Sequence, residues 1–187
     1  MGDNIRHAGL PGARHEENFA EYCRDIPDFP KQGIIFKDIT NLLKNGPVFK
    51  RAIDRMAANY AGNRIDAVVS IEARGFLIGS ALAYRLGSGL VPVRKKGKLP
   101  WRVYRESYAL EYGQDQVEVH QDGITPGQNV LIVDDVIATG GTVEAVVKLI
   151  REMKGNIVGA AFLIELAHLK GREKLKGVPI FSLITYS

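Results

Sequence analysis

The sequence predicts an α/β protein in which a mostly parallel sheet is flanked by helices. Apolar runs without polar alternation, such as residues 130–133, are typical of strands that are covered on both faces. Helical patterns alternate with these runs, which is the order of strands and crossover helices in a parallel sheet. The 187 residues have the length of one domain.

The N-terminal part contains two helical patterns before the first predicted strand. Residues 1–17 are polar and interrupted by Gly and Pro, so we expect a flexible tail. A first helix, ended by Pro27, is predicted from four residues at helical spacing: Phe19, Tyr22, Cys23 and Ile26. An irregular segment then extends to about residue 43. Pro47 begins a second predicted helix that ends near Gly62.

The rest of the chain alternates strands and helices. We expect strands over residues 65–71, 90–93, 130–133, 157–164 and 180–184. A helix is predicted over residues 75–86, with Gly87 ending it, and another follows residue 142. Alternation on either side of residues 112–115 predicts a hairpin with Val117 and Val119 on one face. Ligands of such sheets bind beyond the carboxyl ends of the strands, where Glu72 and Asp134 both fall.

The most informative segment follows the strand at residues 130–133. Asp134 and Asp135 fall where that strand should end, and a turn of small residues precedes the next helix: Ala138, Thr139, Gly140, Gly141 and Thr142. The unpaired N–H groups of a helix start attract phosphate, and glycines let a ligand approach the backbone. Ionised carboxylates accept hydrogen bonds, which suits ribose hydroxyls. The segment therefore predicts a sugar-phosphate site, with Thr142 also a candidate helix cap.

Other phosphate-binding motifs do not match this segment. A P-loop requires a lysine after its glycines, and a dinucleotide site requires G-x-G-x-x-G directly after its strand. The pattern alone leaves one alternative open, which is an ordinary strand-to-helix turn with solvated acids.

Composition and charge limit the class of partner. Much of the net charge of +4 lies in one segment: Arg94, Lys95, Lys96, Lys98, Arg102 and Arg105. Since no zinc-ligand or RNA-binding pattern accompanies it, we expect this segment to attract an anionic small molecule and not nucleic acid. The single cysteine, Cys23, excludes an internal disulfide and suits the cytoplasm. All apolar runs are shorter than ten residues, so we expect no membrane span.

Residues 130–142, VLIVDDVIATGGT, resemble the phosphoribosyl-pyrophosphate (PRPP) motif of type I phosphoribosyltransferases. Five more blocks resemble the adenine-specific members of this family, in the family's order: IPDFPKQGIIFKDIT (26–40), EARGF (72–76), VRKKGKLP (93–100), YALEYG (108–113) and LKGREKL (169–175). The resemblance extends from Phe19 to the C-terminus. It implies a type I phosphoribosyltransferase fold over residues 18–187, with a small hood over about 26–43 and a mobile loop over about 94–116.

The resemblance implies a purine salvage reaction in which adenine and PRPP give AMP and pyrophosphate. Asp134 and Asp135 would then hold the ribose, and residues 138–142 the 5′-phosphate. Pyrophosphate would be held by Arg74, Arg94, Lys95 and Lys98. In the family, the loop that contains Arg74 often has a cis peptide bond before a residue other than proline.

The resemblance also implies the residues that bind adenine. Ile35 and Lys37 lie in the hood, where some relatives have arginine at the position of Lys37. Tyr112 would help to close the site, and Glu111 would donate a proton near purine N7, which requires burial to raise its pKa. From the residues alone, Phe36 and Ile39 are expected to pack in the core.

The resemblance further implies Mg²⁺ as cofactor, held mainly by the substrate oxygens and not by a protein cage. Similar enzymes are homodimers, so some basic residues would reach the neighbouring subunit's site. Two alternatives remain at this point. One is a phosphoribosyltransferase for another purine, and the other is a regulator that senses PRPP without turnover.

Overall fold

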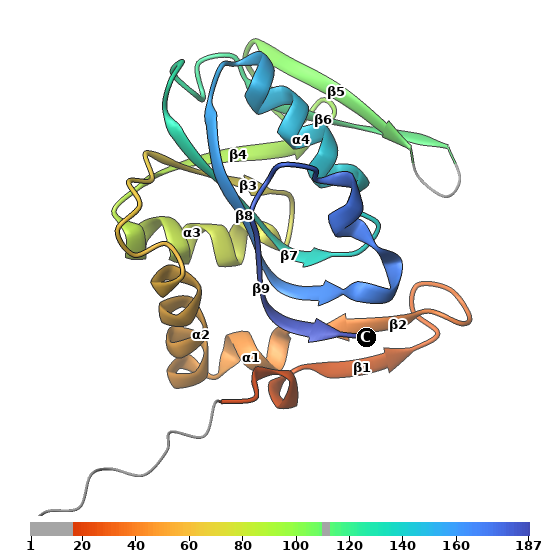
Figure 1. Ribbon diagram of the computed structural model, residues 1–187. Coiled ribbons are helices and arrows are strands. Elements are labelled where there is room, and N and C mark those ends of the chain that lie inside the picture. Colours follow the sequence, from red (N-terminus) through yellow and green to blue (C-terminus); the bar gives the residue numbers. More distant parts are fainter. Residues whose placement is uncertain (1–16, 110–112) are drawn as a thin grey trace, which may run out of the picture.

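Seven strands form the central sheet of the computed structural model, which describes residues 17–109 and 113–187 (Figure 1). Their order is β5-β6-β4-β3-β7-β8-β9. Five strands run parallel: β3 (Ala67–Ile71), β4 (Gly89–Lys95), β7 (Asn129–Ile137), β8 (Asn156–Leu166) and β9 (Ile180–Tyr186). An antiparallel hairpin of β5 (Val103–Ala109) and β6 (Gln114–His120) pairs with β4 at one edge. The predicted fold class, a mostly parallel sheet with helices, is confirmed.

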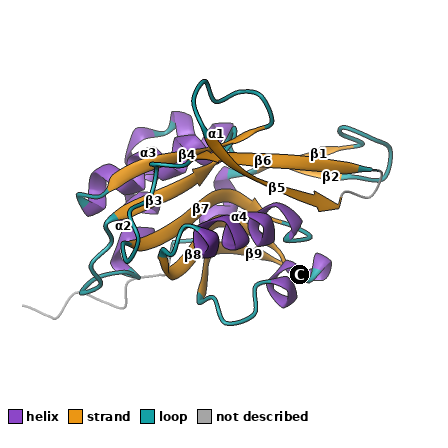
Figure 2. Cartoon of the chain, turned by 90° about the horizontal axis from the view of Figure 1, so that it is seen from above, coloured by secondary structure: helices purple, strands orange, loops and turns teal. Residues whose placement is uncertain are grey.

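Helices cover both faces of this sheet (Figure 2). On one face, α2 (Gly46–Ala58) and α3 (Gly75–Leu86) pack on a core that includes Leu131 and Val133. On the other face, α4 (Gly141–Glu152) packs on Val130 and Ile132. Residues 130–133 have no exposed surface, as expected for a strand covered on both sides.

Two residues that predicted helix ends lie at the expected positions of α2 and α3. Pro47 lies in the first turn of α2, where its missing N–H group costs no hydrogen bond, but α2 ends at Ala58 and not near Gly62. Gly87 ends α3 with a left-handed φ of 68°, as predicted. Within the described parts of the chain, no helix is both long and apolar enough to cross a membrane.

The predicted first helix over residues 19–26 is wrong. Only a four-residue 3₁₀ helix forms (Phe19–Tyr22), and β1 (Arg24–Pro27) follows it. β1 pairs with β2 (Ile35–Asp38) in an antiparallel ribbon, in which Asp25 lies opposite Lys37. The segment predicted as irregular therefore contains β2, and also the short helix α1 (Thr40–Lys44). Cross-strand pairing overrides the helical spacing, because the ribbon gives the backbone its hydrogen bonds.

The β5–β6 pairing confirms the predicted hairpin and its buried face, although Gln114 and Asp115 belong to β6 and not to the turn. Val117 and Val119 are each 1% exposed and belong to the core under α4. Residues 94–116 thus contain the end of β4 and most of the hairpin, and the mobility of this segment stays a prediction. Glu111 and Tyr112 lie outside the described residues.

Candidate active site

The candidate site lies where β3 and β7 part. Their pairing ends at Ser70 and Val133, whereas β7 continues beside β8 to Ile137. Asp134 and Asp135 are therefore inside β7 and not at its end, which corrects the predicted boundary. β3 leads through α3 to β4 on one side, and β7 leads through α4 to β8 on the other. Such a divergence opens a crevice at the carboxyl edge of the sheet, the usual ligand position in open α/β folds.

The loop after β7 forms a cavity at this edge. A volume of about 100 Å³ is lined by Asp134 and by residues 136–143. Gly140 precedes α4 as its N-cap residue, with a left-handed φ of 76°, and no side chain caps the helix. The predicted cap by Thr142 is wrong, because the helix already starts at Gly141. The N–H groups of the first helical turn thus face a cavity that is suited to a phosphate.

A distant segment fixes this loop by backbone contact. A Cβ atom at Gly140 would lie 2.5 Å from the Gly171 carbonyl oxygen, and one at Gly171 would lie 2.3 Å from the Ala138 carbonyl oxygen. The next residue, Arg172, makes a bidentate ion pair with Glu165, with N–O distances of 2.5 and 2.6 Å. Glu165 is 6% exposed, so this pair anchors the segment to the end of β8.

The two carboxylates of β7 are in a poorly solvated environment. Asp134 Oδ1 accepts a hydrogen bond of 2.8 Å from the Asp135 N–H. Burial raises the pKa of Asp134 well above its usual range, and the adjacent charge of Asp135 adds to this. Burial also raises the pKa of Asp135, whereas the Arg74 guanidinium opposes that rise. A Cβ atom at Gly75 would lie 2.7 Å from Asp134 Oδ1, so α3 begins directly against the acidic pair.

Arg74 connects the acidic pair with the hood. Its Nε lies 2.7 Å from Asp135 Oδ2. In the described structure this oxygen accepts no hydrogen bond of good geometry, so the contact with Arg74 is an ion pair. The guanidinium carbon lies 4.5 Å from the centroid of the Phe36 ring, and Nη1 lies 3.5 Å from the Lys37 carbonyl oxygen. Phe36 is therefore a partner of Arg74 and not a buried core residue, whereas Ile39 is in the core at 1% exposure. The Glu72–Ala73 peptide before this turn is cis, as the resemblance implied.

Besides Arg74, which pairs with Asp135, the side chains of the predicted pyrophosphate residues form two ion-pair groups. In the first, Glu72 accepts hydrogen bonds from Arg94 Nε (3.2 Å), from the Lys95 N–H (2.9 Å) and from Lys98 Nζ. Burial alone would raise the pKa of Glu72, but these donors hold it below its usual range. In the second, Lys95 Nζ donates to the hydroxyl of Tyr108 and to Asp115 on the hairpin. The structure thus brings Arg94 and Lys98 to the carboxyl end of β3, and it ties the Lys95 side chain to β5 and β6.

The hood residues predicted for adenine differ in exposure. Ile35 is 55% exposed, whereas the Lys37 side chain is 12% exposed and is turned toward β1 and β9. Sequence reasoning assigned no role to Asp25, Arg172 or Tyr186, although each contacts a site segment through a charged side chain or an aromatic ring. For Arg172, the only indication in the sequence was its place in the block LKGREKL. No sequence pattern indicated a role for Asp25 or for Tyr186.

Comparisons with known proteins agree with this geometry. The phosphoribosyl transferase domain family matches residues 40–184. The adenine phosphoribosyltransferase of Acidobacterium capsulatum is 56% identical over 171 residues, which are 91% of this chain and 94% of that protein. The crystal structure of the Thermoanaerobacter pseudethanolicus enzyme has a TM-score of 0.88 at 49% identity, with 90% of this chain and 98% of that chain covered.

A third relative was solved with ligands bound. The adenine phosphoribosyltransferase of Saccharomyces cerevisiae, complexed with an imino-altritol bisphosphate and adenine, has a TM-score of 0.83 at 40% identity. The match covers 88% of this chain and 98% of that chain. With its matching domain, its sheet order and its similarity to these enzymes over most of its length, the chain belongs to the phosphoribosyltransferase family, among the adenine phosphoribosyltransferases.

Proposed function

We propose that this chain transfers the phosphoribosyl group of PRPP to adenine, which gives AMP and pyrophosphate. One observation carries the proposal: a loop with free helix-start N–H groups follows two adjacent carboxylates at the edge where β3 and β7 part. This arrangement suits a sugar phosphate, because phosphate and hydroxyl groups require opposite hydrogen-bonding partners. The names of the relatives supply the base, adenine.

The proposed binding residues divide into those for the ribose 5′-phosphate and those for the pyrophosphate of PRPP. Ala138, Thr139, Gly140, Gly141 and Thr142 would hold the 5′-phosphate, and Asp134 and Asp135 would accept hydrogen bonds from the ribose hydroxyls. Their ionised forms would also stabilise the positive charge that develops on the sugar. Arg74, Arg94, Lys95 and Lys98 would bind the leaving pyrophosphate through charge-assisted hydrogen bonds.

The base would lie between the hood and the hairpin tip. Ile35 would cover the ring by apolar contact, and the backbone of Lys37 would form hydrogen bonds with it. Glu111 would protonate the purine at N7, and Tyr112 would close the site. Closure would exclude water, which protects the sugar from hydrolysis while it carries positive charge.

The donor set fits a substrate-bound Mg²⁺. Asp134 and Asp135 offer hard oxygen ligands, which Mg²⁺ prefers. Across residues 17–109 and 113–187, no group of three or more potential metal-ligating side chains occurs. The PRPP oxygens would therefore supply most ligands, with Asp134 the protein group nearest to them. When bound, the ion would neutralise charge on the pyrophosphate.

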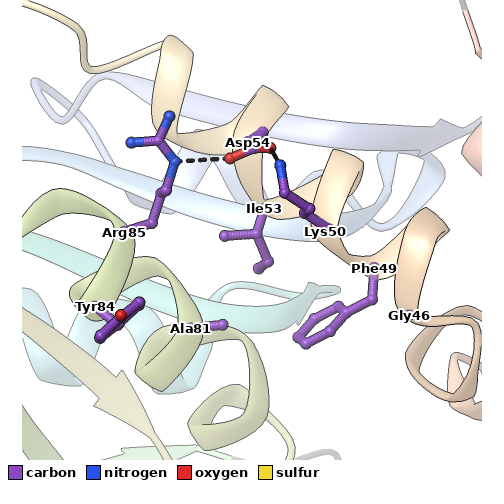
Figure 3. A pocket seen from close by; sticks show the side chains of 8 residues that line it. All are labelled: Gly46, Phe49, Lys50, Ile53, Asp54, Ala81, Tyr84 and Arg85. Carbon is purple, nitrogen blue, oxygen red and sulfur yellow. Dashed lines mark hydrogen bonds and ion pairs between the residues drawn. The ribbon is translucent and has the colours of Figure 1, made fainter.

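We also propose that the protein is a homodimer that is formed through α2 and α3. A groove of about 500 Å³ lies between these helices, with Phe49 and Ile53 on one side and Ala81 and Tyr84 on the other (Figure 3). Tyr84 is 91% exposed, and an exposed aromatic residue in an apolar groove is typical of interfaces.

A second copy of the chain is the occupant that the groove favours. Asp54 at its rim pairs with Lys50 at 2.6 Å and with Arg85 at 2.7 Å, so the rim carries both charges and can pair with itself across a two-fold axis. In addition, α3 begins next to Arg74, so a dimer along α3 would border the active site. In analytical ultracentrifugation we expect a dimer, and we expect a monomer for Tyr84→Asp. A monomeric wild-type protein would contradict this proposal.

The remaining partners are small molecules, and we propose a cytoplasmic location without nucleic acid or membrane, in keeping with the single cysteine, Cys23. The test is an assay with PRPP and Mg²⁺ and one of three bases: adenine, hypoxanthine or guanine. We expect nucleotide from adenine, and a strong loss of turnover in Asp135→Asn and in Glu111→Ala. Preferential use of a 6-oxopurine would instead indicate another purine substrate, and PRPP binding without turnover would indicate a regulator.

A further inference from the structure

The Lys37 side chain is held on the face of the hood that is turned toward the sheet edge. Its Nζ lies 2.7 and 2.8 Å from the two carboxylate oxygens of Asp25, the residue opposite it in the ribbon. The same Nζ lies 3.8 Å from the centroid of the Tyr186 ring. The Lys37 side chain is 12% exposed and that of Asp25 is 56% exposed, so water weakens the ion pair, and the contact with the aromatic face adds to the positioning of the ammonium group.

The opposite face of the same strand contacts the PRPP side of the site. Phe36, the neighbour of Lys37, lies under the Arg74 guanidinium, and Arg74 in turn contacts Asp135. Cation–π contacts thus hold β2 on both faces, one to Arg74 and one to Tyr186. Because successive side chains of a strand point to opposite faces, two adjacent residues suffice for this arrangement.

The hood joins the core through Ile39, directly after β2, but the β1–β2 ribbon itself has few buried side chains and gains from such contacts. β1 and β2 are four residues each, and a two-stranded ribbon of this kind is marginally stable alone. Three of the four β1 residues are exposed, and Ile35 of β2 is 55% exposed. Tyr186, by contrast, belongs to the main sheet, since it ends β9 and pairs with Leu166 of β8 (Figure 1). Burial raises the pKa of Tyr186 to about 12, so its phenol stays neutral under the Lys37 ammonium.

We propose that Tyr186 and Asp25 are positioning residues for the purine base. They fix the Lys37 side chain against the end of β9 and thereby set the height of the β2 backbone over the site. This inference rests on the proposed function, because the β2 backbone is the part of the hood that would contact adenine. It also assigns a role to the lysine side chain, which is to anchor the hood from behind and not to stack on the base.

The test separates the ring of Tyr186 from its hydroxyl. Tyr186→Leu removes the aromatic face, and Tyr186→Phe keeps it, so the second variant is the matched control. We expect Tyr186→Leu to raise the KM for adenine about tenfold, which corresponds to about 1.4 kcal/mol. The KM for PRPP should change less than twofold, and Tyr186→Phe should resemble the wild type in both. Asp25→Asn should also raise the KM for adenine selectively, which provides a second variant if Tyr186→Leu does not fold.

Amide hydrogen exchange of residues 24–38 supplies a second measurement that does not depend on turnover. We expect faster exchange in Tyr186→Leu than in Tyr186→Phe, with the exchange of β3 and β7 unchanged. Equal effects on both KM values, an unchanged adenine KM in Tyr186→Leu and Asp25→Asn, or equal impairment of the Phe and Leu variants would each overturn the inference. A wild-type protein that forms no AMP would instead refute the proposed function, and this inference with it.

Discussion

The close contact between Gly171 and the phosphate loop predicts a large effect of one added methyl group. In Gly171→Ala, the new Cβ would lie 2.3 Å from the Ala138 carbonyl oxygen and 3.0 Å from the Gly140 nitrogen. Both contacts are with backbone atoms, so no side chain can rotate away. The two segments must separate by about 1 Å, and overpacking of this kind costs about 1–3 kcal/mol. For a chain of 187 residues, each kcal/mol lowers Tm by roughly 2–4 °C.

The same displacement should affect the reaction more than the fold. The loop from Ala138 to Thr142 is the proposed phosphate site, and an error of about 1 Å in substrate position can reduce rates about a hundredfold. We expect kcat/KM for PRPP to fall about 10- to 100-fold. Gly89→Ala is the control, because a Cβ there meets only the Asp66 carbonyl oxygen, at an ordinary contact distance of 3.5 Å, and its φ is not left-handed. A kcat/KM for PRPP within twofold of the wild type in Gly171→Ala would refute the reasoning.

Three further predictions concern stability. Glu165→Gln should lower the free energy of unfolding by about 1–2 kcal/mol at pH 7. The loss is no larger because Arg172 is half-exposed, so water solvates part of its charge. Arg172 lowers the pKa of Glu165, so the wild type loses this stabilisation when Glu165 is protonated. In urea titrations, the difference in stability between variant and wild type should therefore shrink as the pH falls below about 4. A difference that does not depend on pH would argue against the ion pair. The opposite pH dependence is expected for Asp134, because its pKa is raised in the folded protein. Ionisation of this group therefore lowers the free energy of unfolding as the pH rises above about 4. Asp134→Asn should be more stable than the wild type at pH 8 and equally stable near pH 4. The idea fails if the variant is less stable at pH 8. Phe162→Ala, at a core position with no exposed surface, should cost about 3–5 kcal/mol in thermal unfolding, and a loss below about 1 kcal/mol would mean that the core closes over the cavity.

Local patterns sufficed where neighbouring residues determine the structure. The apolar run at 130–133, the glycine turn and the helix after it follow from burial and from backbone freedom within 20 residues of chain. The end of α3 at Gly87 is equally local, because the left-handed φ suits a residue without a Cβ atom.

The prediction from sequence failed where contacts with distant segments determine the local structure. Residues 19–26 carry a helical spacing, yet β1 forms because β2, about ten residues further on, supplies its hydrogen bonds. Phe36 looked like a core residue, but Arg74 covers its ring. The contacts of Lys37 with Tyr186 and of Gly140 with Gly171 join parts of the chain that no local pattern relates. Such pairs depend on how the whole sheet is assembled.

The carboxylate of Glu72 has a consequence for which anions can compete with PRPP. It acts as a built-in counterion, since Arg94 and Lys98 already neutralise it before any substrate arrives. In the proposed pyrophosphate site, an incoming anion would have to replace this carboxylate as their partner. A diphosphate has enough oxygens to satisfy both cations at once, whereas a single inorganic phosphate would replace fewer contacts and meet repulsion from Glu72. If Arg94 and Lys98 bind the diphosphate of PRPP as proposed, we therefore expect inorganic phosphate to compete poorly for this site.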